Sequence, residues 1–259
     1  MDKNDILKHN EKSWNKHVEE QFRWTQPYSD NLMQYAKQGK VELFLSPNTP
    51  IPVSWCQFKD KVVLVLAGGG GQQAPLLALA GAKRVVVVDI SMKQLEQDLE
   101  VSRKYNIKNL EVCNCSADKL NIDSESIDLI INPLSSCFFP DMNTVWNEVA
   151  RVLKKSGKIC YAFNNPIAYQ FDYEKSNKGE FELKYPQPFS DIKSFSEEEK
   201  KKFLGNYTSY EFGHSLTDQI GLLLKKGFII EDFFEDHWDS DEPINKYFPQ
   251  FINVLAKKL

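Results

Sequence analysis

The sequence has 259 residues, of which 42% are hydrophobic and 26% are charged, and its formal net charge is −4. This composition is typical of a globular protein and excludes a disordered chain. The acidic balance, without a long Lys/Arg stripe, argues against a nucleic-acid partner. No apolar run approaches the ~20 residues of a membrane span and the N-terminus has no signal-peptide core, so we expect a cytoplasmic protein without a membrane partner.

The five cysteines do not form a recognisable site. They lie in or beside apolar runs, and no two have the Cys-x-x-Cys spacing; they are Cys56, Cys113, Cys115, Cys137 and Cys160. Reduced thiols in a cytosolic protein are the simplest interpretation. Cys113 and Cys115 alternate on one face of a predicted strand, but a metal site would need further ligands, so no metal is predicted.

Residues 1–57 are predicted to form a helical segment that acts as a lid. A helix is expected from about Asn10 to Phe22. A second helix follows Ser29 and stops at Gly39, a residue suited to a left-handed cap. The stretch that follows these helices, residues 46–52, contains three prolines and is predicted to be an extended linker.

Residues 58–163 alternate between strand and helix patterns, which predicts a parallel sheet with helices on both faces. Five strands are expected, over residues 62–66, 84–89, 110–115, 127–131 and 158–163. A helix is expected over residues 144–153. The first strand is a β-branched run typical of a strand buried on both faces. It leads into the glycine loop 68–71 and a helix that ends at Gly81. Ser91 and Gln94 have the spacing of a capping box for the next helix.

Residues 164–212 break this rhythm with prolines and many aromatic residues, and we interpret them as an inserted cap with one charged helix near 196–204. Ser215 and Asp218 then form a second capping box, which opens a helix that ends at Gly227. The side chains expected to face inward in this helix are Leu216, Ile220, Leu223 and Leu224.

The C-terminal part, residues 213–259, is predicted to add two strands, over 228–234 and 251–256. The stretch 231–242 holds seven acidic residues and no Lys or Arg, and we interpret it as a solvated edge and turn. The whole chain is therefore predicted to be a single domain, residues 1–259. Its fold class is α/β, with a doubly wound, mostly parallel seven-stranded sheet.

The glycine loop and Asp89 predict a nucleoside-type cofactor. Glycines let the backbone approach a ligand closely, and the following helix N-terminus offers free N–H groups. Asp89 stands at the end of the second strand, where a carboxylate can accept hydrogen bonds from both ribose hydroxyls. This much fits either a dinucleotide or S-adenosylmethionine. The dinucleotide fingerprint wants a third glycine, and Gln73 stands at that position.

Five motifs in order resemble the class I S-adenosylmethionine-dependent methyltransferases, in particular their small-molecule branch. They are the segments 63–71, 89–95, 117–118, 128–133 and 148–158. The resemblance implies S-adenosylmethionine as cofactor and a small-molecule substrate. Two residues depart from the family pattern: Val65 replaces the usual acid and Ala67 the usual first glycine. The amino-acid end of the cofactor therefore needs another partner, and Gln72 and Gln73 are candidates.

The resemblance also implies roles for individual residues. Asp89 would bind the ribose, Ile90 the adenine face and Asp118 the adenine amino group. The cofactor-binding residues expected in this way are Ala67, Gly68, Gly69, Gly70, Gly71, Gln72, Asp89, Ile90, Gln94, Ala117, Asp118, Asn132 and Pro133. For Ile90 and Pro133 the alternative is plain packing, and for Asp118 it is a turn acid.

Methyl transfer from a sulfonium needs alignment above all, and a general base only where the nucleophile holds a proton. His214 is the candidate base; its alternative is a helix-entry residue. The aromatic residues expected at the substrate pocket are Trp14, Trp24, Tyr28, Phe138 and Tyr169, and their alternative is packing. We expect the N-terminal segment and residues 164–212 to close over the substrate. The competing functions are an NAD(P)-binding oxidoreductase and a non-catalytic S-adenosylmethionine-binding protein.

Overall fold

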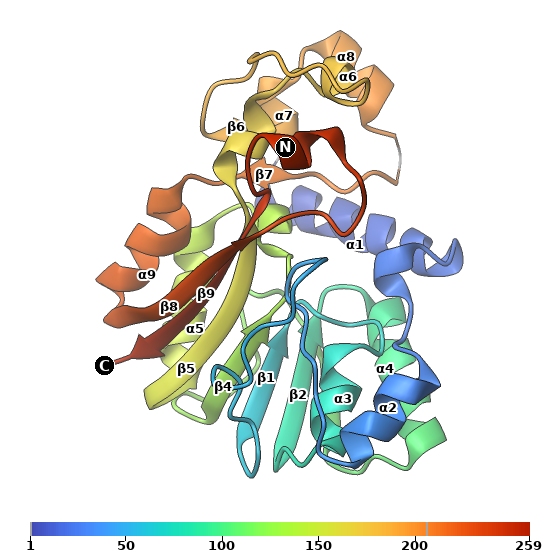
Figure 1. Cartoon of the computed structure of the whole chain (residues 1–259), viewed down its shortest axis with the longest axis vertical. Coiled ribbons are helices and arrows are strands. Elements are labelled where there is room, and N and C mark those ends of the chain that lie inside the picture. Colours follow the sequence, from blue (N-terminus) through green and yellow to red (C-terminus); the bar gives the residue numbers. More distant parts are fainter. Residues whose placement is uncertain (1, 206) are drawn as a thin grey trace.

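The computed structural model describes residues 2–205 and 207–259, and its centre is a seven-stranded sheet (Figure 1). The strands are β1 (Val62–Leu66), β2 (Arg84–Asp89), β3 (Leu110–Asn114), β4 (Ile127–Asn132), β5 (Leu153–Asn164), β8 (Phe228–Asp236) and β9 (Phe251–Lys258). Their order is β3-β2-β1-β4-β5-β9-β8. The first five are parallel, and β9 is antiparallel to both of its neighbours. The predicted fold class, a doubly wound and mostly parallel sheet, is confirmed.

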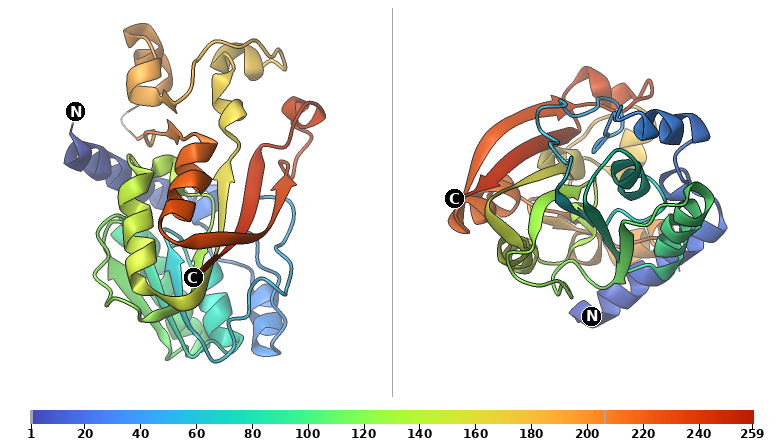
Figure 2. Two further views of the ribbon diagram at one scale, coloured as in Figure 1. Left: turned by 90° about the vertical axis from the view of Figure 1, so that its left-hand side faces the viewer. Right: turned by 90° about the horizontal axis from the view of Figure 1, so that it is seen from below.

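Helices cover both faces of the sheet, as Figures 1 and 2 show. They include α3 (Gln73–Leu79), α4 (Met92–Tyr105), α5 (Met142–Val152) and α9 (Leu222–Lys225). Helix α2 (Asp30–Lys37) packs against α3, and α1 (Lys3–Glu19) packs against α4 at the carboxyl ends of the strands (Figure 1). Side chains alternate between the faces along a strand, so Leu64 packs with the α5 and α9 layer while Val63 packs with the α3 and α4 layer. In β1 and β2 the buried positions are apolar, apart from Asp89 at the end of β2, because both faces of the sheet are covered.

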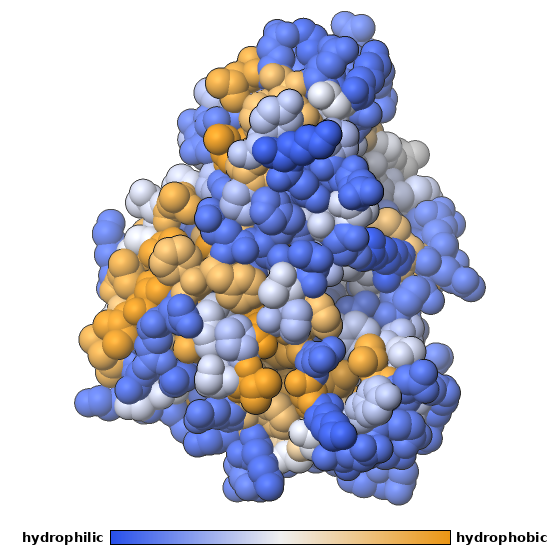
Figure 3. Space-filling view, in the orientation of Figure 1, coloured by the Kyte–Doolittle hydropathy of each residue, from blue (hydrophilic) through white to orange (hydrophobic). Residues whose placement is uncertain are grey.

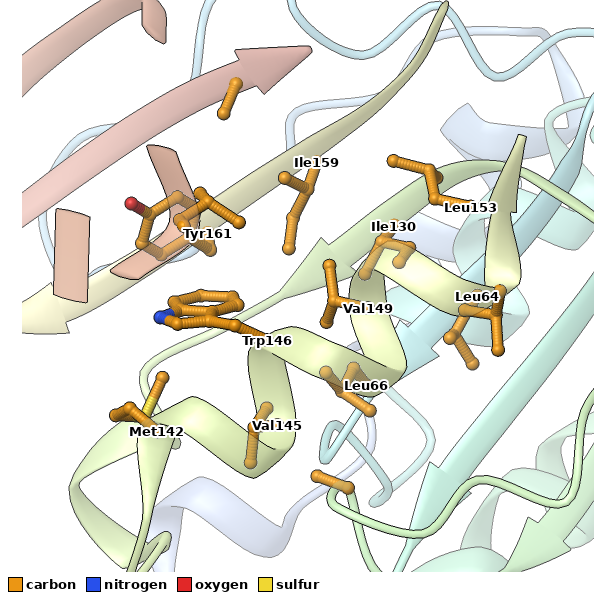
Figure 4. Close-up of a cluster of buried hydrophobic side chains, with 14 of the residues drawn as sticks. Leu64, Leu66, Ile130, Met142, Val145, Trp146, Val149, Leu153, Ile159 and Tyr161 are labelled. Carbon is orange, nitrogen blue, oxygen red and sulfur yellow. The ribbon is translucent and has the colours of Figure 1, made fainter. Parts of the chain in front are cut away.

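The core on the α5 side is centred on two aromatic residues (Figure 4). Trp146 from α5 and Tyr161 from β5 are both fully buried, and their ring centroids lie 5.1 Å apart in an edge-to-face arrangement. Trp146 Nε1 donates to the carbonyl oxygen of Asp218 at 2.9 Å. The indole therefore connects α5 to the C-terminal helical segment as well as to the sheet.

The N-terminal helix differs from its predicted bounds of Asn10 to Phe22. It begins earlier because Asp2 caps it. Asp2 Oδ1 accepts from the backbone N of Asp5 at 2.9 Å, and Asp5 Oδ2 accepts from the backbone N of Asp2 at 3.2 Å. It ends at Glu19 because Gln21 adopts a positive φ of 56°, which a helix cannot continue through. The periodicity predicted the helix, but the capping residues set its ends.

The helix predicted after Ser215 contains a π-helical turn, Thr217–Gly221, before α9. The capping box between Ser215 and Asp218 is confirmed, since Ser215 Oγ accepts from Asp218 N at 3.2 Å and Asp218 Oδ2 from Ser215 N at 3.1 Å. The wider turn shifts the helical phase. Leu223 is fully buried as predicted, but Leu216 and Leu224 are 50% and 43% exposed, so their predicted inward positions are wrong.

The acidic stretch 231–242 is only partly a solvated edge. Asp236 in β8 is 2% exposed and fastens the proline-rich linker to the sheet. Its carboxylate accepts from Ser46 Oγ at 2.6 Å, from Thr49 N at 3.0 Å and from Thr49 Oγ1 at 2.8 Å. These donors hold the pKa of Asp236 below its usual value, against the effect of burial. A buried charge is tolerated here because several hydrogen bonds satisfy it.

Short elements between residues 164 and 213 lie above the carboxyl ends of the strands (Figure 1). They are α6 (Tyr173–Ser176), β6 (Phe189–Ser190), α7 (Asp191–Ser194), α8 (Glu197–Phe203) and β7 (Phe212–Gly213). They share a small aromatic core of Tyr185, Phe189 and Phe195. We call residues 164–212 the cap. Helix α1 runs beneath the cap and is joined to it, because Asn10 exchanges hydrogen bonds with the backbone N and O of Tyr210 at 2.8 and 3.1 Å.

Apolar residues reach the surface over strands β8 and β9 (Figure 3). In β8, Ile229 is 41% and Phe233 is 61% exposed. Among the described residues no helix combines the length and the hydrophobicity that crossing a membrane requires.

Candidate functional site

A cavity of about 830 Å³ lies at the carboxyl ends of the parallel strands. Its floor is formed by residues at or just after the ends of five strands, namely Ala67 to Gly69, Asp89, Ala117, Pro133 and Asn164. The strand order reverses between β1 and β4 at this point, which is where open α/β sheets bind ligands. The opposite wall comes from the N-terminal segment, including Trp14 and Trp24, and from Thr208, Ser209 and Glu211 of the cap.

The glycine loop is shaped by close contacts that exclude larger side chains. A Cβ atom on Gly69 would lie 2.8 Å from Gln94 Cβ, so the start of α4 packs directly against the loop backbone. Gly71 has a φ of +73°, and its Cβ would lie 2.9 Å from Val101. Ala67, which replaces the first glycine of the family pattern, takes a positive φ of 47°. The loop keeps the glycine conformation at this position despite the substitution.

Asp89 is held in one orientation at the cavity floor. Its Oδ1 accepts from Ser91 N at 2.9 Å and its Oδ2 from Gly69 N at 3.2 Å, and the residue is 9% exposed. Burial raises the pKa of Asp89 to about 6, and the backbone hydrogen bonds oppose this shift. The carboxylate is therefore ionised at neutral pH, with lone pairs left to accept from a ligand.

A second aspartate, Asp98 of α4, lies beneath the loop and was not predicted. It is fully buried, and its Oδ2 accepts from Gly70 N at 3.0 Å while Oδ1 has no partner. Burial raises the pKa of Asp98 to about 8. A carboxyl with this pKa is mostly protonated at neutral pH. A lone acid on the apolar stripe of a predicted helix, beside Leu95 and Val101, is the sequence signal that could have found it.

The shifted pKa of Asp98 makes stability depend on pH. The folded protein keeps a proton that the unfolded chain releases above its ordinary pKa of 3.8, so the free energy of unfolding falls as the pH rises from about 4 to about 8. Asp98→Asn keeps an acceptor for Gly70 N and removes this proton. We expect urea unfolding to show a flatter pH profile for the variant and higher stability than wild type near pH 8. Parallel profiles would rule the interpretation out, and the exposed Asp123→Asn is the control.

Three glutamines surround the loop, and their amide groups have different partners. Gln72 Nε2 donates to the carbonyl oxygens of Trp24 and Gln26 at 3.2 and 2.8 Å, so it fastens the N-terminal segment to the loop. Gln73 lines the cavity, and its Oε1 is buried without a hydrogen-bond partner. Gln94 Oε1 is likewise buried and unpartnered. Gln94 Oε1 faces Gly70 of the loop, where a Cβ atom would lie 3.0 Å from it. Gln73 Oε1 is therefore the acceptor without a donor that fits a cofactor carrying an ammonium group.

The capping box predicted between Ser91 and Gln94 is only half formed. Ser91 Oγ accepts from Gln94 N at 3.2 Å. The reverse bond is missing because Ser91 N already donates to Asp89, which leaves the Gln94 side chain at the cavity. The local pattern predicted the cap but not the competing carboxylate.

Two residues of the predicted cofactor set lie behind the cavity wall. Asp118 forms an ion pair with Lys3 and accepts from Ser116 Oγ. Asn132 is fully buried, and its Nδ2 donates to Leu66 O and to Ser135 Oγ, both at 2.7 Å. Asn132 therefore shapes the loop after β4, whereas its neighbour Pro133 lines the cavity.

Most of the remaining predicted residues line the same cavity. Those on its wall are Trp14, Trp24, Tyr28, Ala67, Gly68, Gly69, Gln72, Asp89, Ile90, Gln94, Ala117, Pro133 and Phe138. Gly70 and Gly71 belong to the loop but lie outside the wall.

The predicted base His214 does not line the cavity. Its Nε2 lies 2.8 Å from the carbonyl oxygen of Phe139, and burial lowers its pKa. The histidine is a neutral donor to the backbone at the entry to the C-terminal helical segment, which was its alternative. Tyr169 also lies behind the wall, and its hydroxyl donates to Glu211 at 2.9 Å. Glu211, which sequence reasoning missed, is the cap residue that presents a carboxylate to the cavity.

Comparisons with known proteins agree with this geometry. Residues 64–161 match a methyltransferase domain family. The chain is 37% identical over 235 residues to the methyltransferase YbaJ of Bacillus subtilis, covering 90% of this chain and 91% of that protein. A similar structure is that of an S-adenosylmethionine-dependent methyltransferase from Listeria monocytogenes, with a TM-score of 0.63, 22% identity and coverage of 79% and 92% of the two chains. Another, from Mesorhizobium loti, has a TM-score of 0.58, 17% identity and coverage of 78% and 93%.

Proposed function

Since the chain belongs to the class I S-adenosylmethionine-dependent methyltransferases, we propose that it transfers the methyl group by direct displacement to a small molecule held in the same cavity. S-adenosylmethionine supplies a methyl group already activated by a sulfonium leaving group. One cavity joins the strand-end cradle around Asp89 to the aromatic wall of the N-terminal segment and the cap. That continuity carries the proposal.

The residues of the cradle have complementary tasks. Asp89 accepts from the ribose hydroxyls, and its orientation is already fixed by Gly69 N and Ser91 N. Gly68 and Gly69 line the cavity, so the methionine part packs against their bare backbone. Pro133 lies beside the path between cofactor and acceptor. Preorganised groups of this kind align the reactants without moving during the reaction.

The cap and the N-terminal segment exclude water from the reacting groups. Trp14 and Phe138 form one part of this wall, with ring centroids 5.1 Å apart. Aromatic faces favour a sulfonium as they favour other cations.

We also propose the division of the chain into lid, core, cap and C-terminal part, because the N-terminal segment and the cap enclose the cavity that the core forms. The five cysteines are free thiols, which supports a reducing, cytoplasmic location.

Calorimetric titration tests the cofactor assignment. S-adenosylhomocysteine is expected to bind, while NAD⁺ is not, because Gln73 stands where a dinucleotide site needs glycine. Screening metabolite fractions for S-adenosylhomocysteine production then tests transfer to a small molecule. Binding of NAD⁺ in preference to S-adenosylhomocysteine would contradict the proposal.

Gln73→Leu tests how the amino-acid end of the cofactor is held. We expect about 10- to 100-fold weaker binding of S-adenosylhomocysteine, because the ammonium loses an acceptor that is worth roughly 1.5–3 kcal/mol. Methylthioadenosine lacks the amino-acid part, so its affinity serves as the internal control. An equal loss for both ligands would show that the substitution disturbs the loop instead.

A further inference from the structure

A second carboxylate, Glu211, lines the cavity from the cap side, just before β7. A chain of hydrogen bonds fixes this carboxylate as a hydrogen-bond acceptor. Asn164 Nδ2 donates to the hydroxyl of Tyr169 at 2.5 Å, and that hydroxyl donates to Glu211 Oε2 at 2.9 Å. Because the tyrosine proton points to the carboxylate, Glu211 acts as an acceptor. The bonds found among the described residues use neither Asn164 Oδ1 nor Glu211 Oε1.

We call Glu211, Tyr169 and Asn164 the Glu211 corner. Among the described residues, no positively charged side chain balances the negative charge of this corner. No Lys, Arg or His of residues 2–205 and 207–259 lies within ion-pair distance of Glu211 or of its neighbour Asp191, whose Oδ2 accepts from Glu211 N at 2.8 Å. The cation on the cavity wall, Arg23, is already paired with Asp239. His17 also lines the cavity, and burial lowers its pKa, which keeps it neutral.

Burial disfavours the ionised form of both carboxyl groups in the absence of a cation. It raises the pKa of Glu211, and together with the charge of Glu211 it raises the pKa of Asp191 to about 7. An ionised carboxylate removed from water is costly unless a positive charge accompanies it. A ligand that brings a cation to the Glu211 corner would therefore be favoured over a neutral one of the same shape.

Aromatic rings border the same corner. Asn164 is the register partner of Phe251 across β5 and β9, and the Phe251 ring packs edge-to-face on Trp238 at 4.7 Å. Both rings line the cavity, as does Phe138. Ring faces and a carboxylate together attract organic cations, since the attraction of the ring quadrupole adds to that of the negative charge.

We propose that the methyl acceptor is a protonated amine, bound by Glu211 Oε1 and Asn164 Oδ1 between these rings. The inference rests on the proposed methyl transfer and names its substrate class. The ammonium first gives a proton to Glu211, which frees the nitrogen lone pair. The lone pair then forms the N–C bond as the S–C bond breaks, and the bond electrons remain on sulfur. The products are a methylated ammonium and S-adenosylhomocysteine, and Glu211 holds the proton released.

Two matched pairs of probes test this with the full-length protein: benzylamine against benzyl alcohol, and cyclohexylamine against cyclohexanol. Binding is measured by calorimetry in saturating S-adenosylhomocysteine. We expect each amine to bind at least about tenfold more tightly than its alcohol. Glu211→Gln keeps the shape and the bond from Tyr169, and is expected to reduce that preference to about twofold or less. Glu198→Gln, exposed on α8 of the same cap, is the control and keeps the preference.

The affinity for S-adenosylhomocysteine separates the two proposals. Glu211→Gln should leave it unchanged, because Glu211 lies outside the Asp89 cradle. Equal binding of amine and alcohol by the wild type, failure of both amines to bind, or a preference that survives in Glu211→Gln would overturn the inference. If the wild type binds the amines through Glu211 but does not bind S-adenosylhomocysteine, the proposed methyl transfer fails and the cation site stands.

Discussion

Replacing Asp89 with asparagine is expected to weaken S-adenosylhomocysteine binding by about 100-fold or more. A hydrogen bond to a charged group contributes roughly 1.5–3 kcal/mol, and the ribose offers two hydroxyl donors. The amide also places an N–H group against Gly69 N or Ser91 N, which now donate to the two carboxylate oxygens. Calorimetry of the purified variant measures the loss, and Asp123→Asn, on an exposed turn, is the control.

The pH dependence of binding gives an independent check on Asp89. Its pKa of about 6 means that the carboxyl gains a proton as the pH falls through that value. We expect wild-type affinity to decline below about pH 6, whereas Asp89→Asn shows no such step. An unchanged affinity of Asp89→Asn would remove the carboxylate from the cofactor site.

Trp146→Ala is expected to lower the free energy of unfolding by about 3–5 kcal/mol, the range typical of deleting a buried aromatic side chain. The indole is fully buried between α5 and β5, so its loss leaves a cavity beside Tyr161. It also leaves the carbonyl of Asp218 without its donor at 2.9 Å. Urea unfolding measures the change.

Tyr35→Ala is the matched control for Trp146→Ala, because Tyr35 is 53% exposed on α2. Its unfolding free energy should change by no more than about 0.5 kcal/mol. A loss of similar size in both variants would mean that the burial of Trp146 does not account for the fall in the free energy of unfolding.

The sheet and the cofactor cradle were predictable because their signals are local. The β-branched runs of β1 and β2 show that both faces are covered, and the glycine loop with Asp89 follows directly from them in the sequence. The local pattern was insufficient where two acceptors compete for the same donor. Gln94 illustrates this, since Asp89, two residues before Ser91, occupies the Ser91 backbone N–H that a full capping box needs.

The cap side of the cavity could not be predicted in the same way. Glu211, Tyr169 and Asn164 come from two parts of the cap and the end of β5, and no spacing in the sequence relates them. His214 was favoured because it begins a helix beside the cap, yet the fold directs it to a backbone carbonyl. Residue type and position along the chain identified the right region of the molecule. Only the tertiary contacts show which residues line the cavity and which lie behind its wall.

The hydrogen bonds between Asn10 and Tyr210 have a consequence for ligand exchange. They join α1 to the cap above the cavity, while Gln72 ties the chain after α1 to the glycine loop. A molecule held between the strand ends and the cap adds its own binding energy to the docking of residues 2–29. By thermodynamic linkage, the backbone amides of that segment should exchange with solvent more slowly once the nucleoside product is bound, and any shortening of the N-terminus should speed its escape.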